Sequence, residues 1–218
     1  MNYFAHALPF LDRPYFAAAT GIPDWLTVVD RRVRLRLKLV EPFCVDADPI
    51  TTAIAGGIRQ HLLDDARFHA TPAFVETTIA ITALAREALG IGPGFQASFL
   101  GHLLVEVLLD AVLVERHPRE LQRYYELLES VDPHRLQAVV NRIAAQSTDR
   151  LSGMIALFRE ARILSDYQEN GRLLERMNQV MRRVKLPGLP EEIVEVFAQG
   201  RPMVRRRYEE LLEGIPVR

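Results

Sequence analysis

The sequence predicts an all-α protein, a single-domain bundle of roughly eight to ten helices that spans residues 1–218. Two observations predict this class. Apolar residues recur at helical spacing in many stretches, one of which holds Leu136, Val139, Val140 and Ile143. A capping residue directly precedes a proline suited to the first helical position at Asp48-Pro49, Thr71-Pro72 and Asp132-Pro133.

The order of the helices follows from their start and stop residues. One long helix is expected to begin at Pro49 and the next at Pro72, with a stop at Gly90 and the Gly92-Pro93-Gly94 cluster. An apolar helix follows. Later apolar series predict further helices around Leu121–Leu128, Leu136–Ile143, Leu174–Val184 and Ile193–Leu211. We expect the last series to be interrupted and kinked at Gly200 and Pro202.

Residues Arg32–Leu39 (RVRLRLKL) depart from the helical pattern. Basic and apolar residues alternate strictly in this segment, which is the period of a half-buried strand or an extended arm. We therefore predict a strand or an extended arm here, within an otherwise helical chain.

The composition is that of a soluble globular protein, with 49% apolar and 25% charged residues. The formal net charge of -1 disfavours nucleic-acid binding through a basic field. The single cysteine, Cys44, excludes an internal disulfide and a Cys-rich zinc module. The start MNYFAHALPFLDRPYF lacks the features of a signal peptide, and the longest apolar run contains Glu106 and Asp110. We therefore expect a cytoplasmic protein that does not contact a membrane.

Three polar residues interrupt the apolar segment FLGHLLVEVLLD at every fourth position: His102, Glu106 and Asp110. On a helix such positions drift by only about 40° per step, so the three residues share one stripe. Burying ionised carboxylates is costly unless a cation lies opposite them. The stripe therefore predicts either an arginine partner or a metal ion.

A second stripe with the same spacing lies in GGIRQHLLDDARFH and consists of His61, Asp65 and His69. His and carboxylate residues one turn apart can chelate one ion from a single helix face. Two further candidates precede it, one in NYFAH and one in GIPDW. The predicted metal ligands are His6, Asp24, His61, Asp65, His69, His102, Glu106 and Asp110.

Eight nitrogen and oxygen donors without a thiolate favour Mn²⁺, Fe²⁺, Mg²⁺ or Zn²⁺ in a site of one or two ions. In a hydrolase of phosphate esters, Asp65 or Asp24 would be the carboxylate that orients the attacking water, and Arg59 would bind a phosphate through its guanidinium group. Asp64 lies about 100° around the helix from Asp65 and is expected to support a ligand or to face solvent.

The order of these residues resembles the acyl carrier protein phosphodiesterase family. The resemblance rests on MNYFAH, the Asp of GIPD, the motif G-I-x-x-H-x-x-x-D followed by Pro72, and a later helix with paired acids, all within residues 1–115. It implies one HD-domain-like metal phosphohydrolase domain that favours Mn²⁺ and releases 4'-phosphopantetheine from a carrier-protein serine. The positions that match the family pattern are His6, Asp24, His61 and Asp65.

The chain departs from the family pattern at several positions. His69 stands where a second acid is expected after the first motif, and His102 stands where the later motif is expected to begin with Asp. The family's Asp-His-Phe is replaced by Glu106-Val107-Leu108, and the usual Gly-Asn is replaced by Ala19-Thr20. Because imidazole and carboxylate interchange as ligands, metal binding is expected to persist.

Two alternatives stay open. The ordered set of His, Asp, HxxxD and HxxxE is also similar to the zinc-dependent phospholipase C and nuclease fold. The non-enzymatic alternative is a helical binding protein whose polar stripes form ion-pair networks or hold a structural metal. An acidic carrier protein as substrate would need a basic surface, which the segment Arg31–Lys38 offers.

Overall fold

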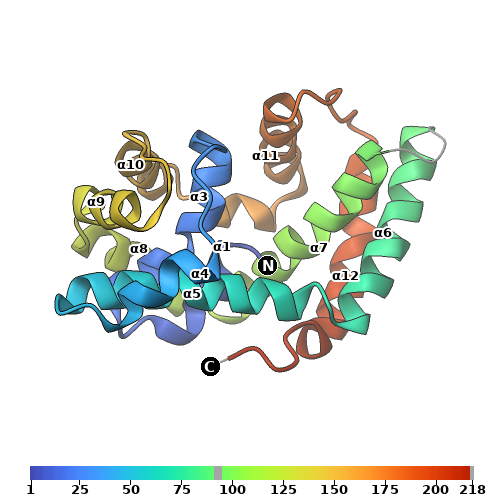
Figure 1. The fold of residues 1–218 in the computed structure, drawn as a ribbon. Coiled ribbons are helices and arrows are strands. Elements are labelled where there is room, and N and C mark those ends of the chain that lie inside the picture. Colours follow the sequence, from blue (N-terminus) through green and yellow to red (C-terminus); the bar gives the residue numbers. More distant parts are fainter. Residues whose placement is uncertain (91–94, 217–218) are drawn as a thin grey trace. The chain divides into compact units, whose positions relative to one another are not determined.

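The computed structural model describes residues 1–90 and 95–216, and every regular element in these ranges is a helix (Figure 1). The all-α prediction is therefore confirmed. The described residues form twelve α-helices and three short 3-10 helices, which is more than the predicted eight to ten. The number was underestimated because four of the α-helices contain eight residues or fewer, too few to give a clear periodicity.

The chain forms two compact units, and each is assembled from segments that are distant in sequence. Arg67–Arg116 and Ile163–Ile215 make up most of the first unit, which also includes Met1. Asn2–Ala66 and His117–Arg162 make up most of the second unit. The prediction of a single domain stays a prediction.

Three long helices, α6 (Pro72–Leu89), α7 (Phe95–Arg116) and α12 (Ile193–Leu211), pack side by side in the first unit (Figure 1). The 3-10 helix η3 (Ile163–Gln168) lies against α7, and α11 (Asn170–Arg183) contacts η3 and α12. Helix α7 is buried on several faces, which explains why its sequence is apolar almost all round.

The same helix α7 is long and apolar enough, by length and composition alone, to cross a membrane. Of the residues in its most apolar stretch, 72% are buried inside this structure. Such burial is typical of the core helix of a folded unit, and α7 packs as a core helix against α6 and α12.

Two glycines permit the close packing around α7. A Cβ atom built at Gly101 would stand 2.1 Å from Oγ1 of Thr82 and 3.1 Å from the carbonyl oxygen of Thr78, both on α6. A Cβ atom at Gly200 of α12 would stand 2.9 Å from a methyl group of Leu108 on α7. A larger residue at Gly101 would force α6 and α7 apart, whereas at Gly200 the side chain of Leu108 would have to move.

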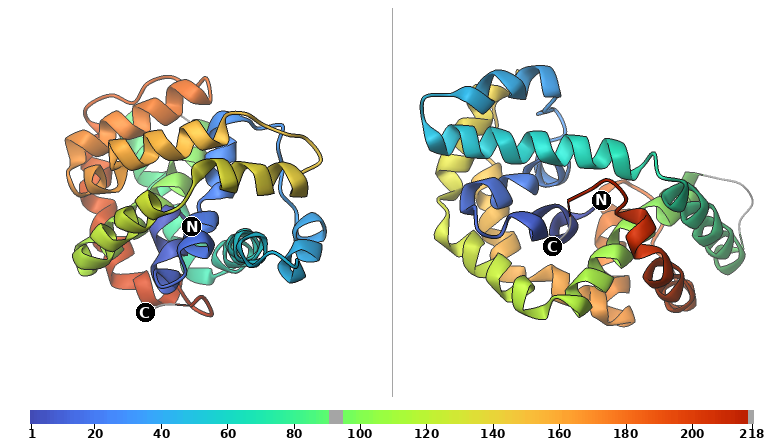
Figure 2. Two further views of the ribbon diagram at one scale, coloured as in Figure 1. Left: turned by 90° about the vertical axis from the view of Figure 1, so that its left-hand side faces the viewer. Right: turned by 90° about the horizontal axis from the view of Figure 1, so that it is seen from below.

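The second unit consists of shorter helices around an aromatic core. Its elements are α1 (Tyr3–Ala7), η1 (Leu8–Phe10), α2 (Pro14–Thr20), α3 (Ile22–Val29), α4 (Leu37–Val40), η2 (Glu41–Val45), most of α5 (Pro49–Phe68), α8 (Pro118–Ser130), α9 (Pro133–Ile143) and α10 (Leu151–Ala161). Phe158 of α10 lies at the centre of this core, with its ring centroid 4.8 Å from that of Tyr3 and 5.3 Å from that of Trp25. Figure 2 shows α5 as one long continuous helix.

The predicted helix starts are confirmed. The Asp48 carboxylate accepts hydrogen bonds from the amides of Ile50 and Thr51 at the start of α5. The Thr71 hydroxyl accepts one from the amide of Phe74, and the Asp132 carboxylate accepts one from the amide of His134. At the other end of α6, Gly90 adopts a left-handed conformation with φ of 60°, as predicted for a helix stop. The Gly92-Pro93-Gly94 cluster lies outside the described residues.

One alternative for Arg32–Leu39 was wrong, because no strand forms there. Val33 to Arg36 have no regular structure and Arg36 has an extended backbone, which fits the extended arm, and the chain then enters the short helix α4. The alternation reflects burial instead, because Val33 is buried whereas the neighbouring arginines are exposed. Helix α12 continues through Gly200 and Pro202 to Leu211, and the kink predicted at these residues stays a prediction.

Candidate metal centres

Two groups of histidine and carboxylate side chains could each hold a metal ion among the described residues. One group consists of His6, His61 and Asp65 in the second unit. The other consists of His69, His102 and Glu106 in the first unit. In each group, one potential ligand atom per residue lies within 4.8 Å of the other two.

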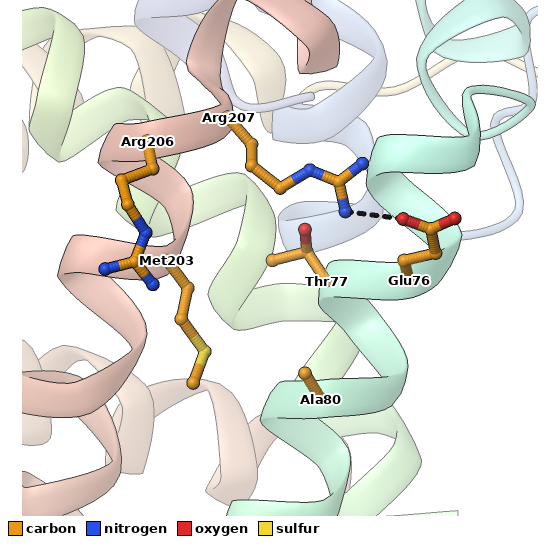
Figure 3. Close-up of a pocket in the computed structure, with 6 residues that line it drawn as sticks. All are labelled: Glu76, Thr77, Ala80, Met203, Arg206 and Arg207. Atoms are coloured by element: carbon orange, nitrogen blue, oxygen red, sulfur yellow. Dashed lines mark hydrogen bonds and ion pairs between the residues drawn. The ribbon is translucent and has the colours of Figure 1, made fainter.

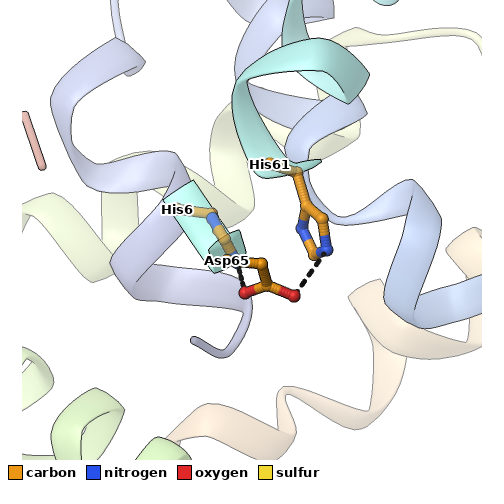
Figure 4. A group of neighbouring side chains, drawn as sticks. All are labelled: His6, His61 and Asp65. Carbon is orange, nitrogen blue, oxygen red and sulfur yellow. Dashed lines mark ion pairs between the residues drawn. The ribbon is translucent and has the colours of Figure 1, made fainter. Parts of the chain in front are cut away.

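In the group of the second unit, helix α1 contributes His6 and α5 contributes His61 and Asp65, one helical turn apart (Figure 4). Nε2 of His6 lies 3.2 Å from one carboxylate oxygen of Asp65, and Nε2 of His61 lies 3.4 Å from the other. Neighbouring ligand atoms around an ion with bonds near 2.1 Å are separated by about 2.9–3.5 Å. The observed spacings fall within this range.

A backbone contact fixes the orientation and the tautomer of His61. Its Nδ1 lies 2.8 Å from the carbonyl oxygen of Thr20, which can only accept a hydrogen bond. Nδ1 therefore carries a hydrogen atom and donates the hydrogen bond. In the neutral ring, Nε2 then presents a lone pair. That lone pair faces carboxylate oxygens of Asp65 at 3.4 Å and Asp24 at 3.9 Å. Lone pairs that face one another repel, so a proton or a metal ion between them would be stabilising.

The ring of His6 is completely buried, and neither of its nitrogens has a hydrogen-bond partner. Its Nδ1 instead faces a carboxylate oxygen of Asp64 at 3.7 Å, while its Nε2 faces Asp65. The rings of His6 and His61 stack with their centroids 4.0 Å apart. Two imidazolium rings stacked at this distance would repel each other, so a single shared metal ion suits the arrangement better than two protons.

The supporting contacts of this group come from small residues and a neighbouring acid. A Cβ atom at Gly57 of α5 would stand 2.2 Å from the carbonyl oxygen of Phe16 on α2, so only glycine lets the two helices approach this closely. This approach brings Thr20, at the end of α2, within reach of His61. Asp64, which is buried, accepts a hydrogen bond from the Gln60 side chain at 2.8 Å. Of the two alternatives for Asp64, support of a ligand therefore agrees with its burial, and exposure to solvent does not.

Asp65 is ionised at neutral pH. Burial raises the pKa of its carboxyl group, but the contacts of the His6 and His61 imidazoles with this group outweigh that effect and hold the pKa well below its usual value. A carboxylate ligand must be deprotonated to bind a metal. Asp65 therefore meets this requirement without further change.

In the first unit, His69 and His102 converge on one oxygen of Glu106. Nε2 of His69 lies 2.9 Å from Oε1 of Glu106, and Nε2 of His102 lies 3.3 Å from the same atom. The Met1 amino group lies 3.4 Å from it. Burial raises the pKa of Glu106, but the Met1 amino group and the imidazoles of His102 and His69 offset this, and the pKa is about 2. Glu106 is therefore a carboxylate at neutral pH.

Other predicted site residues lie apart from these groups. His69 does not continue the stripe of His61 and Asp65, because α5 ends at Phe68 and the next residue turns away into the group of the first unit. Asp110 is fully buried and belongs to neither group. Arg59 is 45% exposed and lies 4.0 Å from Glu41, so it does not contact the ligand set. Asp24, by contrast, lies in the first turn of α3 with one carboxylate oxygen 3.9 Å from Nε2 of His61.

A surface depression of about 230 Å³ lies between α6 and α12 in the first unit (Figure 3). Its lining residues are Glu76, Thr77, Ala80, Met203, Arg206 and Arg207. Arg207 donates hydrogen bonds to Glu76 and Glu210. The residues that line the depression include no histidine and only one acid, Glu76, so they do not offer the set of three ligands found in the two groups.

The basic segment Arg31–Lys38 is exposed at each of its basic residues. Arg32 pairs with Asp30 through two hydrogen bonds of 3.0 and 3.1 Å. This pairing neutralises one of the charges that an acidic partner would meet.

Comparison of the chain with known proteins gives no further assignment. No family model, no curated protein and no solved structure matches it.

Proposed function

We propose that this protein is a divalent-metal-dependent hydrolase of phosphate esters, with His6, His61 and Asp65 as metal ligands and Asp24 beside them. The main support is the orientation of His61. Its Nδ1 donates to Thr20, so its Nε2 lone pair faces two carboxylates, an arrangement that a metal ion between them would stabilise. Two imidazoles and one carboxylate are also a common ligand set of catalytic metal sites.

The group is accessible on one side, as hydrolysis requires. The side chains of Asp65 and Asp24 are 28% and 27% exposed, whereas those of His6 and His61 are at most 3% exposed. A bound divalent ion lowers the pKa of water and offsets the charge that develops on phosphorus. Asp24 and Asp65, which reach solvent, are placed to accept a hydrogen bond from an attacking water and so orient it.

We further propose release of 4'-phosphopantetheine from a carrier protein as the reaction and Mn²⁺ as the favoured ion. The support is the order of His6, Asp24, His61 and Asp65, which resembles the acyl carrier protein phosphodiesterases. The exposed basic segment Arg31–Lys38 offers an acidic carrier protein a complementary surface. Arg59, also exposed, stays the candidate for contact with phosphate.

The test combines metal analysis with two substrates. Chelator-stripped protein reloaded with Mn²⁺ is expected to cleave bis-p-nitrophenyl phosphate, and to release phosphopantetheine from holo acyl carrier protein by mass spectrometry. His61→Ala is expected to lose both metal and turnover, whereas His134→Ala, which removes an exposed histidine on α9, is the matched control. Turnover on the generic diester alone would support the hydrolase and contradict the carrier-protein substrate.

A non-enzymatic metal-binding protein is the second candidate, because both imidazoles of the group are buried as they are in structural sites. Two results together would favour this candidate. The wild type would bind metal and His61→Ala would not, and neither substrate would be turned over with any divalent ion. Absence of metal binding would contradict both.

A further inference from the structure

We propose that His69, His102 and Glu106 form a second, separate binding site for one divalent cation of the zinc type. This proposal concerns the first unit alone and does not rest on the proposed hydrolase function. The ligand atoms would be Nε2 of each histidine and Oε1 of Glu106. Imidazole-rich sets without thiolate favour Zn²⁺ and Co²⁺, and two histidines with one glutamate are a known zinc ligand set.

The convergence of the three side chains carries the inference. His69 follows the end of α5, whereas His102 and Glu106 lie one turn apart on α7. Although they come from different elements, both imidazoles direct Nε2 at one carboxylate oxygen, at 2.9 and 3.3 Å. These spacings match the roughly 2.9–3.5 Å between neighbouring ligands of an ion with bonds near 2.1 Å. A metal ion entering there would leave the three side chains close to their positions and would displace the Met1 amino group, which lies 3.4 Å from the same oxygen.

A hydrophobic wall holds both rings in place. The ring of Phe74 meets those of His69 and His102 edge-on, with centroids 4.8 and 5.0 Å apart. Phe74 is buried on α6, and Gly101 allows α6 to approach α7 at the turn that carries His102. Ligands held before the ion arrives lose little side-chain entropy on binding.

Charge and access also fit a cation. Glu106 is 15% exposed and ionised, so it supplies a buried negative charge. The side chains of His69 and His102 are 33% and 45% exposed, so solvent reaches the group. Water molecules can therefore complete the coordination, and the ion can exchange with solution. Since the hydrolase site has buried imidazoles, we expect the second site to exchange its ion faster.

The test counts ions site by site. The full-length protein is stripped with chelator and titrated with Zn²⁺ against a chromophoric competitor, and with Co²⁺ by visible absorption. His102→Ala is expected to lose one ion per chain, and to weaken Zn²⁺ binding at this site by more than about 100-fold, because even supporting residues cost 10–100-fold. His134→Ala is the control, and Glu106→Gln is a second variant that keeps a hydrogen-bond acceptor while removing the charge.

The outcomes distinguish this inference from the proposed function. Two ions in the wild type with one in His102→Ala supports the second site. One ion in the wild type that is lost in His102→Ala but kept in His61→Ala also supports it, and contradicts the proposed hydrolase site. If His102→Ala and Glu106→Gln, both folded by circular dichroism, bind as many ions as the wild type, the inference is overturned.

Discussion

His61 and His6 are oriented in the same manner, because both nitrogens of each ring face groups of the protein. One nitrogen of each ring is directed to the protein, at the Thr20 carbonyl for His61 and at the Asp64 carboxylate for His6, and the other is directed at Asp65. Such supporting contacts fix which nitrogen can bind a metal and raise its basicity. The contact of Asp64 therefore offers a test that leaves every proposed ligand intact.

We expect Asp64→Asn to weaken Mn²⁺ binding by about 10–100-fold without unfolding the protein, because Asn keeps the shape and accepts the Gln60 hydrogen bond but lacks the charge that faces His6. Isothermal titration measures the affinity. Asp149→Asn, at an exposed position, is the control. An unchanged affinity in Asp64→Asn would show that Asp64 has only a structural role.

Asp48 predicts a pH dependence of stability. Hydrogen bonds from Thr51 and the contact with Arg135 lower the pKa of its carboxyl group from 3.8 to about 2 in the folded state. A depressed pKa stabilises the folded state above pH 3.8, and this contribution is lost as the pH falls toward 2. We expect the urea midpoint of Asp48→Asn to lie below that of the wild type at pH 7 and to approach it near pH 2. An offset that is constant with pH would contradict the assignment.

At the scale of elements, close contacts between helices determine whether ligands meet. Gly57 is the clearest example, since a Cβ atom there would stand 2.2 Å from the Phe16 carbonyl oxygen. We expect Gly57→Ala to destabilise the protein by about 1–3 kcal/mol through overpacking, and to weaken metal binding because α2 and Thr20 move away from His61. Chemical denaturation and titration measure the two effects.

The control for that change is Gly153→Ala. Gly153 lies exposed within α10, and a Cβ atom there would meet nothing within 4 Å. Alanine is favoured over glycine inside a helix by about 0.5–1 kcal/mol, so this variant is expected to be slightly more stable than the wild type. Equal destabilisation by both substitutions would show that helix packing is not the cause.

The sequence was most informative about element boundaries and least informative about short elements. Asp48, Thr71 and Asp132 marked helix starts correctly because capping depends on a few neighbouring residues. The strand expected at Arg32–Leu39 was wrong because alternating burial also arises in an irregular segment that lies along a surface. His69 was assigned to the wrong group because the helical stripe assumed that α5 continues past Phe68.

At the scale of the whole molecule, the sequence predicted the all-α class but not the division into two compact units. Each unit combines segments separated by dozens of residues, such as Asn2–Ala66 with His117–Arg162. Local periodicity identifies which face of a helix is buried, but it contains no information on which distant helix covers that face. The six predicted ligands that lie in the two groups likewise could not be divided between them from spacing alone.

Metal removal should change the stability of the folded chain. A ligand that binds only the folded state at 100 times its Kd stabilises it by about 2.7 kcal/mol. We therefore expect chelator treatment to lower Tm and Mn²⁺ to restore it in the wild type, with a smaller shift in His61→Ala. Differential scanning calorimetry measures the shift. An equal Mn²⁺ response in both proteins would place the ion elsewhere.

The turn of α7 that holds Gly101 and His102 is subject to two separate requirements. Gly101 has no room for a side chain beside Thr82, whereas His102 is 45% exposed and its position tolerates many residues on steric grounds. In a library randomised at both positions, a screen for folding alone should keep glycine at 101 and accept variety at 102. A screen for bound zinc should recover histidine at 102 as well. Selection at these adjacent codons therefore distinguishes a requirement of packing from one of chemistry.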